Sequence, residues 1–205
     1  MINELENNLK DTLGWHKSRI RCLVQIIMGL IAVRSVNLKE LACAFMGATE
    51  LNSHYRRLQR FFAQVRFPRH TLANLLLGLF YSADEKVYLS MDRTNWQWGK
   101  ANINLLVLSA CYRGVAIPLY WRALDKRGNS NTQERIALIK EFIDGFGKAR
   151  IAGLLGDREF VGDNWLAYLL DQQIAFDLRV KKLCQQQLTG FRSRYRGIIL
   201  SSTAE

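Results

Sequence analysis

The sequence has few of the residues that interrupt a chain or cross-link it. Its 205 residues include two prolines and four cysteines, with no Ser-rich or Gly-rich run. Because 49% of the residues are apolar, we expect a globular chain with little disordered linker. The cysteines and the three histidines are scattered. This spacing argues against a zinc site and favours reduced cysteines.

The sequence also lacks a recognisable targeting or membrane-spanning segment. Its first six residues, MINELE, include two acids and no basic residue, whereas a secretory signal begins with a basic stretch. The longest apolar run, residues 20–33, contains Arg21 and Gln25 and is too short to span a bilayer. We therefore expect a cytoplasmic protein with no membrane partner.

Acidic residues are the minority, because 18 Asp and Glu stand against 29 Lys and Arg, a net charge of +11. Residues 1–80 carry a net charge of +6, residues 81–180 only +1, and residues 181–205 +4. A near-neutral middle between basic ends is typical of a protein that binds a polyanion around a site with acids of its own. The charge raises the odds of a nucleic-acid partner without deciding the matter.

The first eighty residues show the spacing of amphipathic helices. Apolar side chains recur every three or four positions, and Pro68 interrupts the pattern. We predict helices over residues 3–13 and 18–34, a third after residue 37, a fourth after residue 53 and a fifth through residues 71–79. The expected N-caps are Ser18, Asn37, Ser53 and Thr71.

The spacing changes to that of strands near residue 86. Runs of apolar residues predict strands at residues 87–92, 102–113 and 115–121, and Pro118 favours a sheet edge or a bulge for the third. A helix from residue 131 or 132, a strand at 151–155, a helix at 164–173 and a strand at 175–180 follow. This order predicts an α/β fold with a mixed sheet and right-handed crossovers.

Two of the predicted strands lead into an aspartate. Asp92 closes the first strand, in SMDRTNW, and Asp157 closes the fourth, in GDREF. Sites of α/β sheets form at strand ends, and neighbouring carboxylates repel each other unless a cation lies between them. Mg²⁺ or Mn²⁺ suits such oxygen ligands and supports phosphoryl transfer. The plain alternative is that each aspartate forms a turn or caps a helix.

The two motifs resemble those of a known family. DRTNW and GDREF look like the first and second acidic motifs of bacterial insertion-sequence transposases, which are DDE-type enzymes with a ribonuclease H-like core. The likeness includes YRRLQRFF at residues 55–62 and continues to about residue 182. It implies a helical DNA-binding region at residues 1–82, a partial ribonuclease H-like catalytic core at 83–182, and a basic tail at 183–205.

By this resemblance, Asp92 and Asp157 would be the catalytic residues and would bind two Mg²⁺ (or Mn²⁺) ions. The family cuts DNA at the ends of its mobile element and joins the freed 3′-hydroxyl to target DNA. The implied partners are therefore the insertion-sequence ends, the target DNA and further copies of the chain in a homo-oligomer.

The family's third acid has no counterpart here. It is a glutamate within Tyr-x2-Arg-x3-Glu-x6-Lys, and neither Tyr168 nor Tyr195 begins that pattern. Beyond residue 182 the sequence becomes QQQ and a basic tail, which resembles an early stop or a change of frame. We therefore expect a C-terminally truncated chain with weak or absent cleavage, because two protein ligands position the second metal poorly. Glu159 and Asp177 are the possible substitutes for the third acid.

Other residues are candidates for contact with DNA. Phosphate contacts are expected from Arg56, Arg57, Arg60, Lys181 and Lys182. The alternatives are a solvated arginine face over packed phenylalanines and a solvated tail. Trp96 and Trp98 flank the expected site, at the end of the first motif and two residues beyond it, where they either stack on a base or pack within the protein.

Three functions remain open at this point. The first is a DNA transposase, truncated and weakly active or inactive. The second is a non-catalytic DNA-binding protein that could inhibit a full-length transposase by mixed assembly. The third is a metal-dependent nuclease whose third acid is Glu159 or Asp177.

Overall fold

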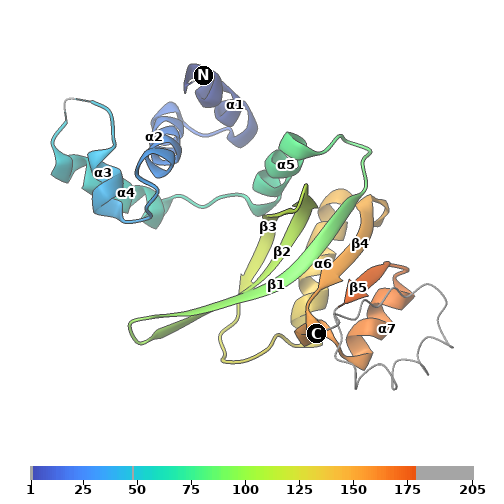
Figure 1. Cartoon of the computed structure of the whole chain (residues 1–205). Coiled ribbons are helices and arrows are strands. Elements are labelled where there is room, and N and C mark those ends of the chain that lie inside the picture. The colour runs from blue at the N-terminus through green and yellow to red at the C-terminus, as the bar shows by residue number, and fades with distance from the viewer. Residues whose placement is uncertain (1, 48, 179–205) are drawn as a thin grey trace. The chain divides into compact units, whose positions relative to one another are not determined.

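The computed structural model describes residues 2–47 and 49–178 (Figure 1). The chain divides into two compact units after Thr71, whereas the sequence placed its boundary at residue 82. The division lies earlier because α5 (Arg69–Phe80) buries Ala73 and Leu77 in the core of the sheet. None of the described helices is long and apolar enough to cross a membrane.

The described part of the first unit consists of helices α1 (Ile2–Leu13), α2 (Lys17–Val33), α3 (Leu38–Cys43) and α4 (Leu51–Gln64). Its buried side chains recur at helical spacing, for example Ile20, Leu23 and Val24 on α2. On α4, Leu58 and Phe61 are buried in the same way. The predicted helical region is thus an amphipathic helical unit with its own core.

The predicted helix caps are confirmed at one position and wrong at the three others. Asn37 caps α3, where its side chain accepts a hydrogen bond from the Lys39 amide at 2.9 Å. Ser18 lies inside α2, because His16 precedes the helix and accepts from the Ser18 amide. Ser53 lies inside the first turn of α4, where its amide donates to the Glu50 carbonyl at 2.9 Å. Thr71 is the third residue of α5, which begins at Arg69.

The described part of the second unit is a mixed five-stranded sheet with helices. Its strands are β1 (Val87–Trp98), β2 (Ala101–Tyr112), β3 (Val115–Ala123), β4 (Ile151–Gly156) and β5 (Phe176–Leu178), in the spatial order β3-β2-β1-β4-β5. The first three strands are antiparallel, and β4 and β5 add in parallel. Helices α6 (Thr132–Phe146) and α7 (Asp163–Asp171) connect the later strands. The predicted ribonuclease H-like order of elements is confirmed.

Two details of the sheet depend on pairing between distant residues. β3 is an edge strand, and its register shifts where Pro118 pairs with Ser109, as the proline predicted. β1 does not end at Asp92 as predicted, because its pairing with β2 continues to Trp98 opposite Ala101. The polar run after Asp92 lacks the apolar alternation that identifies a strand, and only its partner strand keeps it extended.

The sheet has one buried side and one side that carries polar groups. Along β1, Val87, Leu89 and Met91 are buried, whereas Tyr88 and Asp92, at alternate positions, are exposed. The buried side packs with residues of α5, α6 and α7, and Figure 1 shows α6 behind the strands. We call the opposite side the open face. Its residues include Tyr88, Ser90, Asp92, Thr94, Val107, Leu155 and Asp177.

Candidate active site on the open face

The two aspartates follow the last paired residues of neighbouring parallel strands. Met91 of β1 pairs with Gly156 of β4, and Asp92 and Asp157 are the next residues on each chain segment. Asp157 has an extended backbone (φ −80°, ψ 172°), so it continues the alternation of the strand. Equivalent positions on neighbouring strands face the same side. The register therefore brings both carboxylates to the open face, and both residues are exposed.

A hollow on the open face contains both aspartates. Its volume is about 650 Å³, and Asp177 of β5 also lines it. Asp177 pairs in register with Leu155, two residues before Asp157, which places it on the same side of the sheet. The polar residues of the lining are Ser90, Asp92, Thr94, Ser109, Asp157 and Asp177.

Each aspartate of the pair makes the same local hydrogen bond. Asp92 Oδ1 accepts from the Arg93 amide and Asp157 Oδ1 accepts from the Arg158 amide, both at 2.7 Å. Asp157 is also the N-cap of the short 3-10 helix η2 (Arg158–Phe160). The structural role considered for Asp157 is therefore present, and it holds the carboxylate at the edge of the hollow.

Glu159 is bound to Arg93, the residue that follows the first aspartate. Arg93 Nε and Nη2 donate to the two carboxylate oxygens of Glu159 at 3.0–3.3 Å. Because successive side chains of a strand alternate, Arg93 points to the side opposite Asp92. Glu159 is therefore engaged away from the open face, whereas Asp177 lies on it. Of the two substitutes considered for the third acid, the geometry favours Asp177.

A buried arginine contacts the backbone of Glu159 in this ion pair. Arg135 of α6 is 5% exposed. Its Nη2 donates to the Glu159 carbonyl at 3.0 Å and to the Ser130 carbonyl at 2.7 Å, and its guanidinium lies over the Phe160 ring. Burial lowers the pKa of Arg135, and the Glu159 carboxylate opposes that change. Arg135 was not among the residues predicted for the site, although its charge on the apolar stripe of α6 was a usable signal.

The glycine before Asp157 has a packing role. A Cβ at Gly156 would lie 2.8 Å from Leu178 Cδ2 and 3.4 Å from Phe160 Cδ2. These side chains belong to the buried core. A larger residue at this position would push β4 away from β5 or displace η2. The motif therefore needs glycine there to keep Asp157 next to Asp92.

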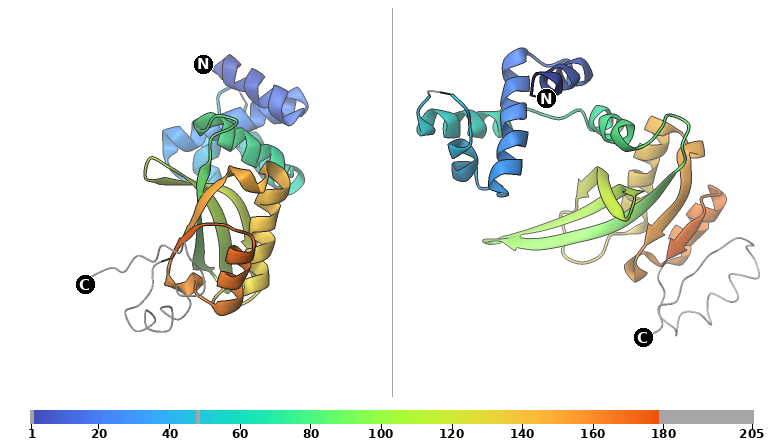
Figure 2. Two further views of the ribbon diagram at one scale, coloured as in Figure 1. Left: turned by 90° about the vertical axis from the view of Figure 1, so that its right-hand side faces the viewer. Right: turned by 45° about the horizontal axis from the view of Figure 1, so that its top comes forward.

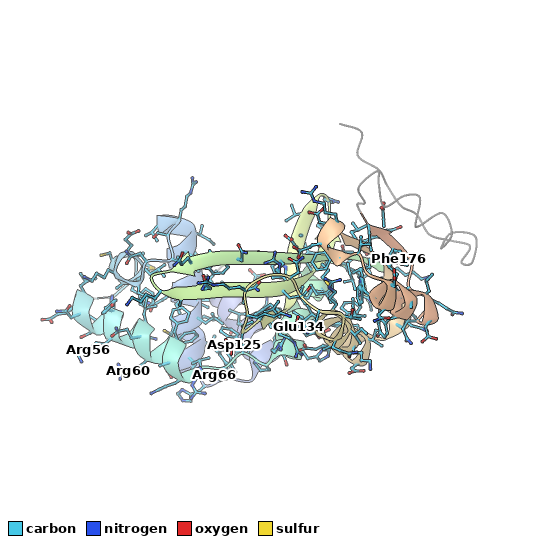
Figure 3. The ribbon with its side chains drawn as sticks, turned by 90° about the horizontal axis from the view of Figure 1, so that it is seen from below. Arg56, Arg60, Arg66, Asp125, Glu134 and Phe176 are labelled. Atoms are coloured by element: carbon cyan, nitrogen blue, oxygen red, sulfur yellow. The ribbon has the colours of Figure 1, made fainter. Side chains whose placement is uncertain are left out.

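The arginines predicted to contact DNA do not share one environment. Arg56 and Arg60 are exposed along one side of α4 (Figure 3). Arg57 instead joins α4 to α2, donating to the Ser18 carbonyl at 3.2 Å and to the Gln25 side chain at 3.4 Å. Lys181 and Lys182 lie outside the described residues.

The acid pair offers a divalent cation two carboxylates in an open hollow. Within residues 2–47 and 49–178, no three His, Cys, Asp or Glu side chains gather closely enough to hold a metal ion. Two hard oxygen donors still fit Mg²⁺ or Mn²⁺, because these ions retain waters and take further ligands from substrate phosphates. The donor set is thus compatible with such an ion and smaller than the three acids of a DDE site.

Comparison with known proteins gives structural similarity only. No protein-family model and no curated protein matches the sequence. The HTLV-2 integrase catalytic core domain in complex with magnesium is similar in its dimeric form, with 14% identity, a TM-score of 0.36, and 54% of this chain and 69% of that chain covered. Its trimeric form has 14% identity and a TM-score of 0.36, with 54% of this chain and 74% of that chain covered.

A third similar structure is the simian T-cell lymphotropic virus intasome in complex with PP2A regulatory subunit B56 gamma. It has 11% identity and a TM-score of 0.38, with 55% of this chain and 39% of that chain covered. These low TM-scores leave the fold assignment resting on the strand order and connections described above.

Proposed function

We propose that this chain is a metal-dependent DNA-processing protein of the transposase class, which cuts a DNA strand and joins the freed 3′-hydroxyl to a target. The observation that carries the proposal is the placement of Asp92 and Asp157 at equivalent positions of two parallel strands, on the open face. The exposed Arg56 and Arg60 and the net charge of +11 support DNA as the partner. Assembly into a homo-oligomer on DNA belongs to the same proposal.

Each group of the site has a proposed role. Asp92 and Asp157 would hold Mg²⁺ or Mn²⁺, which supplies positive charge to the phosphoryl transition state and lowers the pKa of bound water. The ion pair of Arg93 with Glu159 keeps the two aspartates in register. The hollow leaves room for a DNA backbone beside them. Two carboxylates position a metal less well than three, so we expect slow or undetectable cleavage.

Metal binding by the full chain tests the acid pair directly. Titration with Mn²⁺ in a calorimeter should give an affinity that falls about ten-fold or more in Asp92→Asn and in Asp157→Asn, because each loses a charged ligand. Asp144→Asn, an exposed acid on α6, is the matched control and should bind as wild type does. Unchanged Mn²⁺ affinity in both site variants would refute the metal site.

Nicking of supercoiled plasmid tests the chemistry. We expect a slow reaction at most with Mg²⁺ or Mn²⁺, abolished by Asp92→Asn. Fast nicking that depends on Asp92 would show that the two-carboxylate site is sufficient. Loss of nicking in Asp177→Asn would identify Asp177 as a third ligand and favour the nuclease. DNA binding without Mn²⁺ binding or nicking would leave the non-catalytic DNA-binding alternative.

A further inference from the structure

The first two strands continue past the rest of the sheet as a two-stranded arm. Pairing of β4 with β1 ends at Met91, and pairing of β3 with β2 begins only at Leu105. Residues 95–98 and 101–104 therefore pair with each other alone among the described strands. Figure 2 shows this ribbon extending beyond the neighbouring strands. We call residues 95–104 the arm. Four residues per strand give it a length of roughly 13 Å.

The arm carries side-chain amides on one of its two sides. Because side chains alternate along a strand, Asn95 and Gln97 of β1 share a side with their register partners Asn104 and Asn102 of β2. Asn95, Gln97 and Asn102 are exposed. Asn104 is 4% exposed, and its amide group donates to the Lys126 and Gly128 carbonyls at 2.9 and 3.0 Å. Asn104 thus fixes the loop beside the arm, and the three exposed amides form what we call the amide face.

The loop held by Asn104 adds positive charge next to the amide face. With the amide oxygen of Asn102 turned toward it, Arg127 donates from Nε and Nη2 at 3.2 Å each. Lys100 occupies the two-residue turn at the tip of the arm and is exposed, as Arg127 is. A hollow of about 420 Å³ lies between arm and loop, lined by the amide face, Lys126 and Arg127. The surface is polar and carries cations.

We propose that the amide face, with Lys100 and Arg127, enters the major groove of a DNA duplex; this inference rests on the proposed function, which supplies DNA as the partner. The major groove of B-DNA is about 12 Å wide and admits a two-stranded ribbon. Asn and Gln pair with the N6 and N7 edge of adenine, and Arg with guanine. An arm of roughly 13 Å covers about four base pairs. Asn95 and Gln97 share a side of β1 with Arg93, opposite Asp92, so a duplex held by the amide face lies on the side of the sheet opposite the acid pair.

The same chemistry disfavours double-stranded RNA. The major groove of A-form RNA is too deep and narrow for side chains to read, and its accessible groove presents 2′-hydroxyls. A ribbon whose exposed groups are amides spaced along both strands matches the base edges of DNA better.

Binding of a fluorescent mixed-sequence DNA duplex to the full chain tests the arm, with EDTA present so that the acid pair has no metal. The triple variant Asn95→Ala, Gln97→Ala, Asn102→Ala should lose about ten-fold or more in affinity. Arg127→Ala should lower the affinity about ten-fold, as expected for loss of a guanine contact, and Lys100→Ala should reduce the slope of log affinity against log salt by about one. The matched controls are Asn164→Ala on α7 and Lys140→Ala on α6, both exposed, and both should bind as wild type does.

A second measurement leaves the protein unchanged. A duplex in which 7-deazapurines replace the purines lacks the N7 acceptors of the major groove and keeps its phosphates. Wild type should bind it about ten-fold more weakly, and the triple variant should not discriminate between the two duplexes.

The outcomes separate this inference from the proposed function. No binding of duplex DNA by wild type would overturn both. Wild-type affinity in the triple variant, together with equal binding of the two duplexes, would overturn the arm inference and leave the proposed function standing. Arm-dependent binding of an RNA duplex but not of DNA would also overturn it.

Discussion

Arg93 and Glu159 follow the two aspartates of the site by one and two residues, and they bind each other across 66 residues of chain. A bidentate guanidinium–carboxylate pair restricts both side chains in distance and direction. Arg93 is 13% exposed at its side chain and Glu159 22%. Solvent therefore screens this pair less than a surface ion pair. The pair acts as a strut between the first and second acidic motifs.

A double-mutant cycle tests the strut. Arg93→Ala leaves a half-buried carboxylate without its donor, and we expect it to lower the free energy of unfolding in urea by about 1–3 kcal/mol. The Arg93→Ala, Glu159→Ala double variant should lose less than the sum of the single losses, because neither group is then left alone.

A positioning role adds a second expectation for these variants. Mn²⁺ affinity at the acid pair should fall in Arg93→Ala even though both aspartates remain. Arg93→Lys should restore it poorly, because an ammonium cannot make the bidentate contact. Additive losses of stability together with unchanged Mn²⁺ affinity would contradict the strut.

At the scale of elements, the start of α6 holds the loop that borders the arm. Asn131 and Glu134 form a capping box, with hydrogen bonds of 2.9 and 2.7 Å, and Lys126 pairs with Glu134 at 2.9 Å. Burial by itself would raise the pKa of Glu134. The hydrogen bond from Lys126, with further help from the Asn131 amide, holds the pKa below its ordinary value. The folded chain therefore favours the charged form of Glu134 over its protonated form more strongly than the unfolded chain does.

Because the pKa of Glu134 is lowered in the folded chain, the stability of the fold should depend on pH. A carboxyl group with a lowered folded pKa stabilises the fold above its unfolded pKa of about 4.3, and the contribution is lost as the pH falls through the folded value. Glu134→Gln keeps an acceptor for the cap and removes the charge, so it should lower the melting temperature at pH 7. The difference from wild type should shrink as the pH falls below about 4. A difference that stays constant down to pH 2 would contradict the assignment.

At the scale of the whole molecule, the part of the chain that the structure describes has two cores rather than one. In the described residues, the first unit buries side chains such as Leu58 of α4, which is fully buried, and the sheet buries a separate cluster that includes Leu108 of β2. Each core is built from residues on its own side of Thr71. A cavity made in one core should therefore lower mainly the stability of the unit that contains it.

Hydrogen exchange measured by mass spectrometry tests this division. Leu58→Ala removes a buried side chain, and we expect a loss of about 2–5 kcal/mol in the stability of the helical unit. Protection of the amides in α2 and α4 should fall accordingly, while protection in β1, β2 and β4 stays at the wild-type level. Leu108→Ala is the reciprocal variant. Equal loss of protection in both units would show that they unfold together.

The sequence by itself determined the order of elements and the identity of the acid pair. Apolar periodicity and turn residues are local signals, so the helices, the order of the strands along the chain, and an edge or a bulge for the strand with Pro118 could all be predicted. The GDREF motif follows a buried strand, which was enough to single out Asp157 as a candidate. The boundary between the two units was harder to predict, because α5 has helical spacing like the helices before it.

The tertiary structure decided which partners these residues meet. In the sequence, Arg57 resembles the neighbouring arginines of the same helix. In the structure its side chain instead donates to Ser18 and Gln25, because α2 packs beside α4. Arg93, which binds Glu159, and Asp177, which reaches the hollow, lie on opposite sides of the sheet because of strand alternation and register. The arm exists because β2 keeps a polar stretch of β1 extended. Such pairings depend on residues far apart in the chain, and local periodicity carries no information about them.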